Sequence, residues 1–189
     1  MRNECILAMG VIALASVPVL AQDGWVTLFD GTNLDSWSEL GGTEWTIADG
    51  VVEGSGESGH LLSNDSYSDF VLTLEFWVDS PANSGVFIRC ADPEAVSPNT
   101  CYEVNIFDQR EDQTYRTGGI VNFAAPDPQV DAGGQWNSYE IRAEGSRLHI
   151  TLNGTVTVDM EDDTFAEGPF TLQYGSGIVR FRNVRIQPL

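Results

Sequence analysis

Lysine is absent from this sequence, because all 9 of its Lys and Arg residues are arginines. Catalysis through a lysine Schiff base needs the ε-amino group, and a phosphate-binding P-loop needs a lysine beside its glycines. Both kinds of site are therefore excluded. The G-x-S-x-G motif is also missing, so nothing in the sequence indicates an α/β-hydrolase serine.

Positive charge is scarce in general. The 9 arginines stand against 28 Asp and Glu, and the formal net charge is −19. A surface this acidic repels the phosphates of nucleic acids and of anionic lipids. We therefore expect no nucleic-acid partner, and the charge favours neutral ligands such as sugars. Since charged residues make up only 20% and hydrophobic residues 42% of the 189 residues, the composition is that of a folded domain.

Residues 1–21 have the pattern of a secretory signal peptide. Arg2 supplies a positive start, an apolar stretch follows, and Val19-Leu20-Ala21 forms a small-residue cleavage site. We expect export, periplasmic or secreted, with cleavage near Ala21–Gln22 and no membrane attachment afterwards. The alternative is a retained anchor helix, although the apolar run is short for a membrane span.

Cysteine is rare, with 3 residues in the whole chain. Cys5 lies in the predicted signal peptide, so the mature chain keeps Cys90 and Cys101. An even number of cysteines in an exported protein predicts a disulfide between them. Two free buried thiols are the alternative.

Sustained helical periodicity is missing as well. About a dozen short segments rich in Val, Ile, Thr, Phe and Trp recur instead, separated by Gly, Asn, Asp and Pro. Asn153-Gly154 lies between two alternating runs and is typical of a hairpin turn. We predict an all-β fold, a two-sheet antiparallel jelly-roll sandwich, in a single domain covering residues 22–189.

Alternation along three predicted strands places one charged residue on each polar face: Glu75, Arg89 and Glu103. If these strands are neighbours, the three side chains share one face, and two acids around one arginine make a tolerable charge cluster. On the same face we expect the aromatic platforms Trp77, Phe87 and Phe107. An ordinary solvated face with cross-strand ion pairs is the alternative.

The two histidines do not predict a metal site. His60 follows a glycine-rich turn and is interpreted as loop surface, whereas His149 lies in a predicted strand. Their positions match neither a metal-ligand spacing nor a nucleophile–base pair. The acidic run 161–163 is interpreted as a solvated turn, with calcium binding as the alternative. No cofactor is predicted, and a divalent cation stays open.

Eight segments in one order resemble a known family. They are GWVTLFDGTNLDSW (24–37), EWTIADGVVEG (44–54), FVLTLEFWV (70–78), NSGVFIRC (83–90), CYEVNIFD (101–108), TGGIVNF (117–123), QWNSYEIRAEGSRLHITLNGT (135–155) and GPFTLQYGSGIVRFRNVRIQPL (168–189). The sequence resembles the 3-keto-disaccharide hydrolase domain family. This resemblance implies a concanavalin A-like jelly roll that acts on glycosides already oxidised to a ketone at C3.

The resemblance also implies a reaction that begins beside that ketone. A base removes the proton from C2, the enolate is stabilised, the C1 substituent leaves, and water then adds to the enone. It points to Glu75, Arg89 and Glu103 as catalytic residues, with one glutamate as the base and Arg89 orienting a carboxylate or stabilising the enolate. The candidate substrate contacts are Trp77, Asn83, Asn105, Asp108, Thr117, Gln173 and Tyr174.

One segment departs from the family pattern. Many members read Leu-Gln-Asp-His-Gly near the last strands, whereas this chain has Leu172-Gln173-Tyr174-Gly175. If the family histidine transfers a proton or binds a metal, this chain lacks that group. Tyr174 can donate a proton in its place or stack on the sugar.

Two other functions remain open. The same fold would suit a non-catalytic carbohydrate-binding module, with Trp77 as a platform for the glycan. A direct-displacement glycosidase would instead need two carboxyl groups about 5 Å or about 6.5–9.5 Å apart across a cleft, a role for Glu75 and Glu103.

Overall fold

A computed structural model describes residues 24–189, so the predicted signal peptide lies outside the described residues. The regular secondary structure of the described chain consists of antiparallel strands and the short 3₁₀ helix η2 (Gln113–Tyr115), which lies in a loop. No helix within residues 24–189 is long and apolar enough to span a membrane. The strands are β1 (Val26–Phe29), β2 (Trp37–Ala48), β3 (Val51–Ser63), β4 (Phe70–Val78), β5 (Ser84–Ile88), β6 (Tyr102–Ile106), β7 (Trp136–Glu144), β8 (Arg147–Leu152), β9 (Thr155–Glu161), β10 (Thr171–Tyr174) and β11 (Val179–Pro188).

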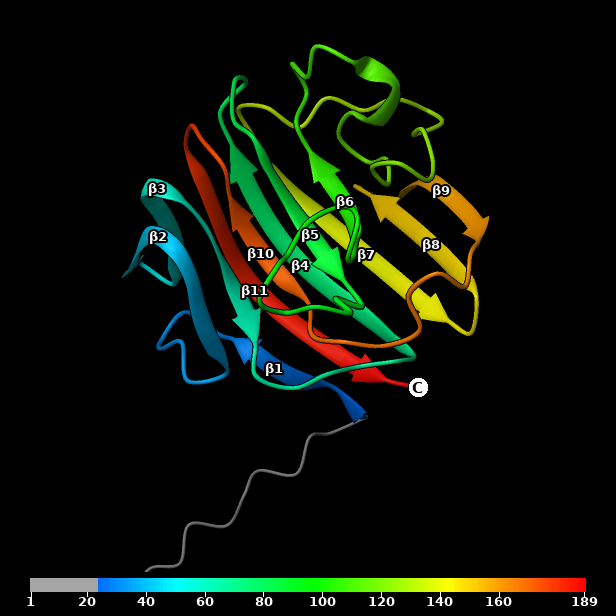
Figure 1. The fold of residues 1–189 in the computed structure, drawn as a ribbon. Coiled ribbons are helices and arrows are strands. Elements are labelled where there is room, and N and C mark those ends of the chain that lie inside the picture. Colours follow the sequence, from blue (N-terminus) through cyan, green and yellow to red (C-terminus); the bar gives the residue numbers. More distant parts are fainter. Residues whose placement is uncertain (1–23) are drawn as a thin grey trace, which may run out of the picture.

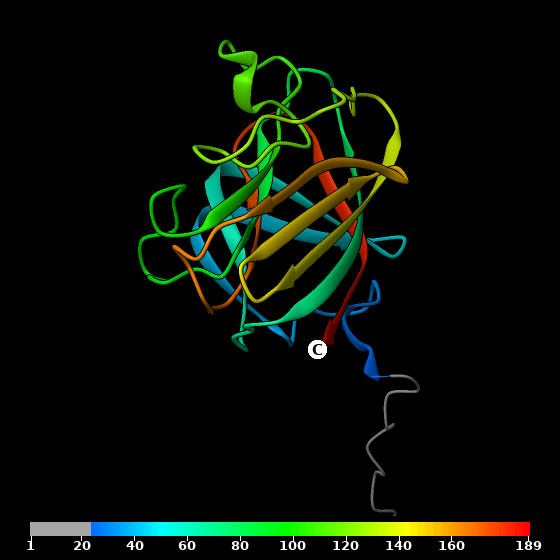
Figure 2. The same ribbon diagram turned by 90° about the vertical axis from the view of Figure 1, so that its right-hand side faces the viewer.

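The strands form one sheet in the order β6-β5-β10-β3-β11-β4-β7-β8-β9, with β1 beside β11 and β2 beside β3. The sheet curls on itself, so that β5, β6 and β10 form a layer in front of β4, β7 and β8 (Figures 1 and 2). The predicted two-layer antiparallel fold is therefore confirmed, and the two layers are continuous. Residues 118–123 are one of the Val- and Ile-containing segments that were expected to be strands, and this prediction is wrong: apart from isolated bridges at Ile120, the segment forms turns.

β3 is the strand that joins the two layers. Its last part pairs with β10, with His60 opposite Gln173, and its first part pairs with β11, with Glu53 opposite Arg180. Between these parts β3 has one more residue than β2, because Glu57 and Ser58 together face Gly42. Such a bulge bends a strand and reverses which side chains face inward.

The core lies inside the curl. The predicted alternation in β4 is confirmed: Leu72, Leu74, Phe76 and Val78 are at most 3% exposed, while Glu75 on the other side is half-buried. Inward residues of every layer meet in one cluster, which is the burial that holds the curl closed.

Turn chemistry sets the connections between strands. Asn153 and Gly154 join β8 to β9 with φ of 52° and 79°, and Asp49 and Gly50 join β2 to β3 with φ of 52° and 78°. Two consecutive residues with positive φ are the pattern of a hairpin turn whose twist matches the strands. The prediction at Asn153-Gly154 is confirmed.

The predicted disulfide is also confirmed. Cys90 follows the end of β5 and is bonded to Cys101, which precedes β6. The bond closes the loop between two paired strands, so it fixes the end of the front layer from which Glu103 projects.

Candidate active site

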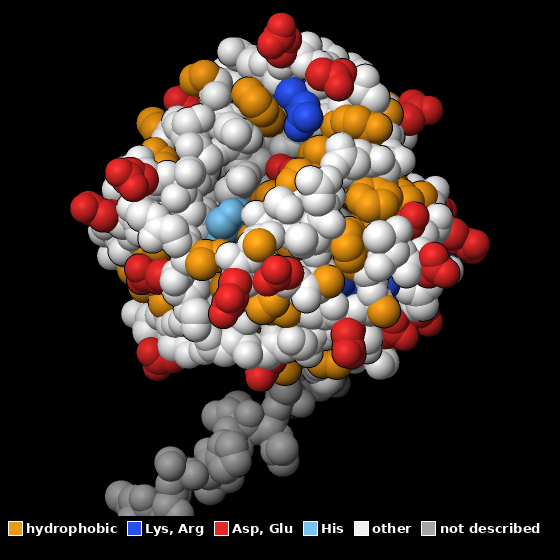
Figure 3. Space-filling model, viewed as in Figure 1, with side chains coloured by type: hydrophobic (Ala, Val, Ile, Leu, Met, Phe, Trp, Pro, Cys, Tyr) orange, Lys and Arg blue, Asp and Glu red, His pale blue; other side chains and the backbone are white. Residues whose placement is uncertain are grey.

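A hollow lies on the outward face of the front layer, over β3, β5 and β10. Figure 3 shows this face with a histidine, an acidic and an arginine side chain on the walls of the hollow. The register explains why polar groups gather here: Phe87 of β5 faces both Glu103 of β6 and Thr171 of β10, and Gln173 of β10 faces His60 of β3. Residues facing each other across strands have side chains on the same side of the sheet.

Glycine at position 85 makes room for the hollow. A Cβ atom built at Gly85 would lie 3.3 Å from both Cγ and Oε1 of Glu103 and 3.4 Å from the Phe87 ring. The Glu103 side chain therefore lies over the backbone of Gly85, in space that any larger residue at this position would share.

Glu103 is the most perturbed acid of this face. It is 7% exposed, and within residues 24–189 no group donates a hydrogen bond to its carboxyl. Burial raises the pKa of Glu103 to about 7, although the positive charge of Arg110 acts in the opposite direction. A carboxyl group with a pKa near neutrality can both give and take a proton at physiological pH.

His60 projects from β3 on the same face, with Phe87 between it and Glu103. Its ring packs edge-on against Phe87 with centroids 5.2 Å apart, and its Nδ1 lies 3.0 Å from Oγ1 of Thr171. Burial lowers the pKa of His60 to about 4, so the ring is neutral at pH 7. The interpretation of His60 as loop surface is wrong. The alternation of His60 and Leu62 with Leu61 was the signal of a strand that would have placed it.

Two amide oxygens on this face lack partners. Asn105 Oδ1 and Gln173 Oε1 are buried, and within residues 24–189 neither accepts a hydrogen bond. The Asn105 amide nitrogen donates to the carbonyl of Tyr115, which fixes its orientation. An unpaired buried acceptor costs about 1–3 kcal/mol, which a ligand hydroxyl group could recover. Both residues were predicted as sugar contacts, and this assignment stays a proposal.

The loop after β6 forms the rim. Phe107, Arg110, Glu111 and Asp112 line a cavity of about 530 Å³ at its edge. Arg110 is the guanidinium whose charge acts on Glu103. The sequence analysis predicted Arg89 as the arginine of the site, and no local sequence pattern indicated Arg110.

Asp108 and Thr117 are hydrogen-bonded to each other within the rim. Asp108 accepts hydrogen bonds from the Thr117 hydroxyl at 2.6 Å and from the backbone amides of Ala132 and Gly133, each at 2.8 Å. Arg116 completes the cluster with an ion pair to Asp108 at 3.6 Å. Their role as sugar contacts stays a prediction, since the structure shows them only in hydrogen bonds within the protein.

Asn83, which precedes β5, and Tyr174, the last residue of β10, have different surroundings from Gln173. Asn83 pairs through its backbone with Ser176, and its side chain packs against Gly175. Tyr174 points inward: it is 9% exposed, and its ring is 2.9 Å from where a Cβ at Gly54 would be. Alternation on β10 sends Gln173 outward and Tyr174 into the core, so Tyr174 does not take the place of the family histidine in the hollow.

Arg89 is a structural residue. Its side chain is 1% exposed and donates hydrogen bonds to the carbonyls of Ser68 and Gly145, each at 2.8 Å, and to Asp69 at 3.1 Å. It follows the last residue of β5 with φ of 51°, which breaks the strand alternation on which its prediction depended. Arg89 therefore ties two loops together below the sheet.

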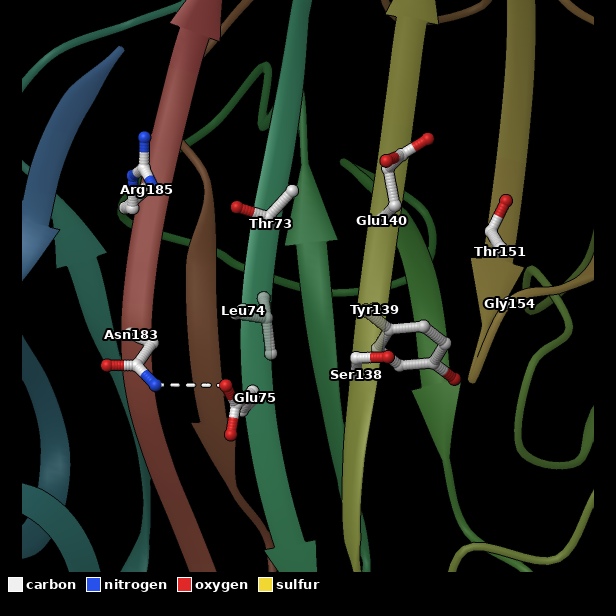
Figure 4. A pocket seen from close by; sticks show the side chains of 10 residues that line it. All are labelled: Thr73, Leu74, Glu75, Ser138, Tyr139, Glu140, Thr151, Gly154, Asn183 and Arg185. Atoms are coloured by element: carbon white, nitrogen blue, oxygen red, sulfur yellow. Dashed lines mark hydrogen bonds between the residues drawn. The ribbon is translucent and has the colours of Figure 1, made fainter.

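Glu75 lies on the other layer. It projects from β4 beside β11 and β7 (Figure 4), and β10, β3 and β11 separate its strand from β5. Arg182 donates to it at 2.7 Å and Asn183 at 2.9 Å. Partial burial would raise the pKa of Glu75, but these hydrogen bonds and the charge of Arg182 outweigh it, and the net shift is downward.

The predicted convergence of Glu75, Arg89 and Glu103 is therefore wrong. Trp77 shares the outward face of β4 with Glu75, so it is also remote from the hollow. The carboxyl pair of a direct-displacement glycosidase cannot be formed by Glu75 and Glu103, since they lie on opposite layers. Within the described range 24–189, no three His, Cys, Asp or Glu side chains are grouped as metal ligands.

Comparison with known proteins places this geometry in a family. A 3-keto-disaccharide hydrolase from Bacteroides thetaiotaomicron is 33% identical over 78 residues, covering 34% of this chain and 27% of the relative. The crystal structure of a provisionally described glycosyl hydrolase from Parabacteroides distasonis is similar with a TM-score of 0.77 and 21% identity, covering 90% of this chain and 98% of that one. The carbohydrate-binding module CBM66 from Bacillus subtilis has a TM-score of 0.62 and 20% identity, covering 87% of this chain and 95% of the module.

These structures confirm the jelly-roll fold. The matched region spans about a quarter of the length of the curated relatives. Residues 24–187, nearly all of the described chain, match the family model described as the 3-keto-alpha-glucoside-1,2-lyase-like domain. The chain therefore belongs to the 3-keto-alpha-glucoside-1,2-lyase-like domain family.

Proposed function

We propose that this protein cleaves the glycosidic bond of 3-keto-glycosides, with Glu103 as the group that moves protons. The observation that carries the proposal is the unpaired, buried carboxyl of Glu103 in the hollow, with its pKa raised to about 7. Membership of the family supports the substrate class, a sugar with a ketone at C3.

The ionised Glu103 would take the proton from C2 of the sugar. The electron pair of that C–H bond then forms the C2–C3 double bond, and the ketone oxygen becomes an enolate oxygen. In the next step this oxygen re-forms the carbonyl, the C1–O bond breaks, and the leaving-group oxygen takes a proton. Water adds to the resulting enone, so that the net reaction is hydrolysis.

Other residues of the hollow have matching roles. The guanidinium of Arg110 is the nearby positive charge that can stabilise an enolate oxygen. The neutral ring of His60 can exchange a hydrogen bond without adding charge. The free oxygens of Asn105 and Gln173 can accept hydrogen bonds from sugar hydroxyl groups and so orient the ring.

The test is turnover of a 3-keto-disaccharide beside the same disaccharide without the ketone. We expect release of the free sugar and keto-sugar from the first substrate only. Glu103→Gln should reduce kcat by at least about 10²-fold, the usual contribution of a proton-transfer group. Glu75→Gln is the matched control on the other layer and should keep full activity. Unchanged turnover in folded Glu103→Gln would remove this residue from the mechanism.

A non-catalytic carbohydrate-binding module is the second candidate. It is favoured by the similarity to CBM66, which covers nearly the whole of both chains. This function would give saturable binding of an unoxidised glycan in the hollow and no product from any 3-keto substrate. Isothermal titration of the same sugars used in the assay separates the two functions.

A further inference from the structure

The outward face of the second layer carries two adjoining hollows that are remote from Glu103. The first, of about 520 Å³, crosses β11, β4, β7 and β8 (Figure 4). The second, of about 550 Å³, lies over β2, β3 and β11. Trp136 of β7 and Arg180 of β11 line the second hollow, so the two hollows lie side by side on one face. Each volume falls in the range of small-molecule sites.

The register aligns the polar side chains of this face in rows. Arg185 of β11, Thr73 of β4, Glu140 of β7 and Thr151 of β8 face one another in order. In Figure 4 the Arg185 and Glu140 side chains stand on either side of Thr73. Since neighbouring strands are about 4.8 Å apart, Arg185 and Glu140 stand roughly 10 Å from each other across a hydroxyl-lined floor.

Neither of these two charged groups has an ionic partner among the described residues. Within residues 24–189, Arg185 forms no ion pair, and its guanidinium is held 5.0 Å from the Trp25 ring. Glu140 likewise forms no ion pair or side-chain hydrogen bond among the described residues. A fixed donor and a free acceptor on two sides of one trough are what a ligand rich in hydroxyl groups requires.

Aromatic side chains border the same rows. Trp77 and Trp136 face each other across β4 and β7, with Arg180 5.1 Å from the first ring and Arg182 3.9 Å from the second. Trp136 is 36% exposed. An exposed indole held by an arginine is a rigid apolar surface on which a sugar ring can lie.

The charges of these rows balance, in a protein whose net charge is −19. Glu53 pairs with Arg180 and Glu75 with Arg182, and the third acid of the rows, Glu140, stands opposite the third arginine, Arg185. Outside the rows, the lining of the second hollow holds one further acid, Asp49. A charged ligand would meet a like charge in each row, whereas a neutral ligand would not.

We propose that this face is a second carbohydrate-binding surface, which holds an extended neutral glycan between the Arg185–Glu140 trough and the Trp136 platform. This binding surface does not depend on the proposed catalytic function, because none of its residues belongs to the hollow around Glu103. A chain with both sites would hold a polysaccharide on one layer while a sugar occupies the other.

The test is affinity electrophoresis of the mature protein through gels that contain a soluble α-glucan, β-glucan or β-fructan. We expect retardation by at least one of the three polymers. Trp136→Ala and Glu140→Gln should each weaken the affinity for the polymer by about tenfold, the effect of losing one central contact. Asp159→Asn is the matched control, since Asp159 pairs with Arg147 at the edge strands of the same layer.

Glu103→Gln separates this surface from the hollow. Retardation that persists in Glu103→Gln and is lost in Trp136→Ala supports the proposal. Retardation by none of the three polymers, or retardation lost in Glu103→Gln and kept in Trp136→Ala, overturns it. Turnover of the 3-keto substrate is measured in a separate assay, so the retardation result can be interpreted even if the catalytic proposal fails.

Discussion

Glu103 lies over Gly85, with its Oε1 atom 3.3 Å from where a Cβ of residue 85 would be. The backbone φ of Gly85 is not positive, so its conformation is open to other residues, and the side chain of a replacement meets Glu103 first. The glycine therefore keeps space for a side chain and for the ligand beside it.

Gly85→Val should fill the hollow. We expect kcat/KM on the 3-keto substrate to fall by at least about tenfold, because the valine takes the place of the sugar and displaces Glu103. Gly85→Ala should have a smaller effect, since its single methyl group needs a shift of only a few tenths of an ångström. Steady-state kinetics with thermal melting checks both variants. Full activity in folded Gly85→Val would mean that the sugar binds elsewhere.

Glu103→Gln should increase stability at alkaline pH. Folding raises the pKa of Glu103 from 4.5 to about 7, so the folded state binds the proton more tightly and stability falls as the pH rises between these values. Above pH 7 the free energy of unfolding has fallen by its full amount, about 3 kcal/mol. Urea unfolding should show the variant to be more stable than wild type at pH 8, with the difference shrinking toward pH 4.5. An equal difference at both pH values would contradict the burial of a charged Glu103.

His60 should make the opposite contribution. Folding lowers its pKa from 6.5 to about 4, so the unfolded state binds the proton more tightly and stability falls as the pH drops through this range. The glutamine of His60→Gln cannot be protonated, so the stability of this variant should not show this decline at acidic pH. Urea unfolding of both proteins at several values between pH 4 and pH 7 measures it. Parallel curves for the variant and wild type would show that His60 is more exposed than the structure has it.

Arg89→Met should unfold the protein more easily without changing the chemistry. The substitution leaves the carbonyls of Ser68 and Gly145 without this donor, and the carboxylate of Asp69 loses its cationic partner and keeps only the Gly145 backbone amide. We expect a loss of about 3–5 kcal/mol, the usual effect of removing one partner from a buried charged network. At a temperature where the variant stays folded, kcat should equal that of wild type. A loss of kcat with stability unchanged would return Arg89 to the catalytic residues.

Removal of the disulfide should lower stability. Cys90 and Cys101 are 11 positions apart, and closing a loop of this size contributes about 3 kcal/mol. The double variant Cys90→Ala/Cys101→Ala should melt several degrees below wild type, and a reducing agent should lower the melting temperature of wild type only. Equal melting temperatures with and without reductant would show that the bond does not stabilise the fold.

Local patterns of the sequence predicted local features well. The alternation of β4, the hairpin at Asn153-Gly154 and the Cys90–Cys101 bond each depend on residues close to one another in the chain. Glu103 was also selected by the alternation of its strand, whereas Asn105 and Gln173 were selected through the resemblance to the family.

The order of the strands in the sheet could not be predicted from the sequence. The proximity of Glu75 to Glu103 required β4 to lie beside β5 and β6, whereas β10, β3 and β11 come between them. Arg89 was misplaced by one left-handed residue at a strand end, which alternation cannot foresee. Arg110 comes near Glu103 through a loop, and His60 joins the same face only through the long-range pairing of β3 with β10.

The extra residue of β3 determines which side chains of the following residues point outward from the sheet. Before the bulge at Glu57 and Ser58, Glu53 points outward from the second layer, and after it His60 points outward from the first. Deleting one residue here would leave Glu53 and its arginine in place but turn His60 into the core and Leu61 into the hollow. A single-residue deletion far from any ligand could therefore abolish one face of the molecule and spare the other, which makes the length of this short glycine-rich stretch as much a determinant of function as the identity of Glu103.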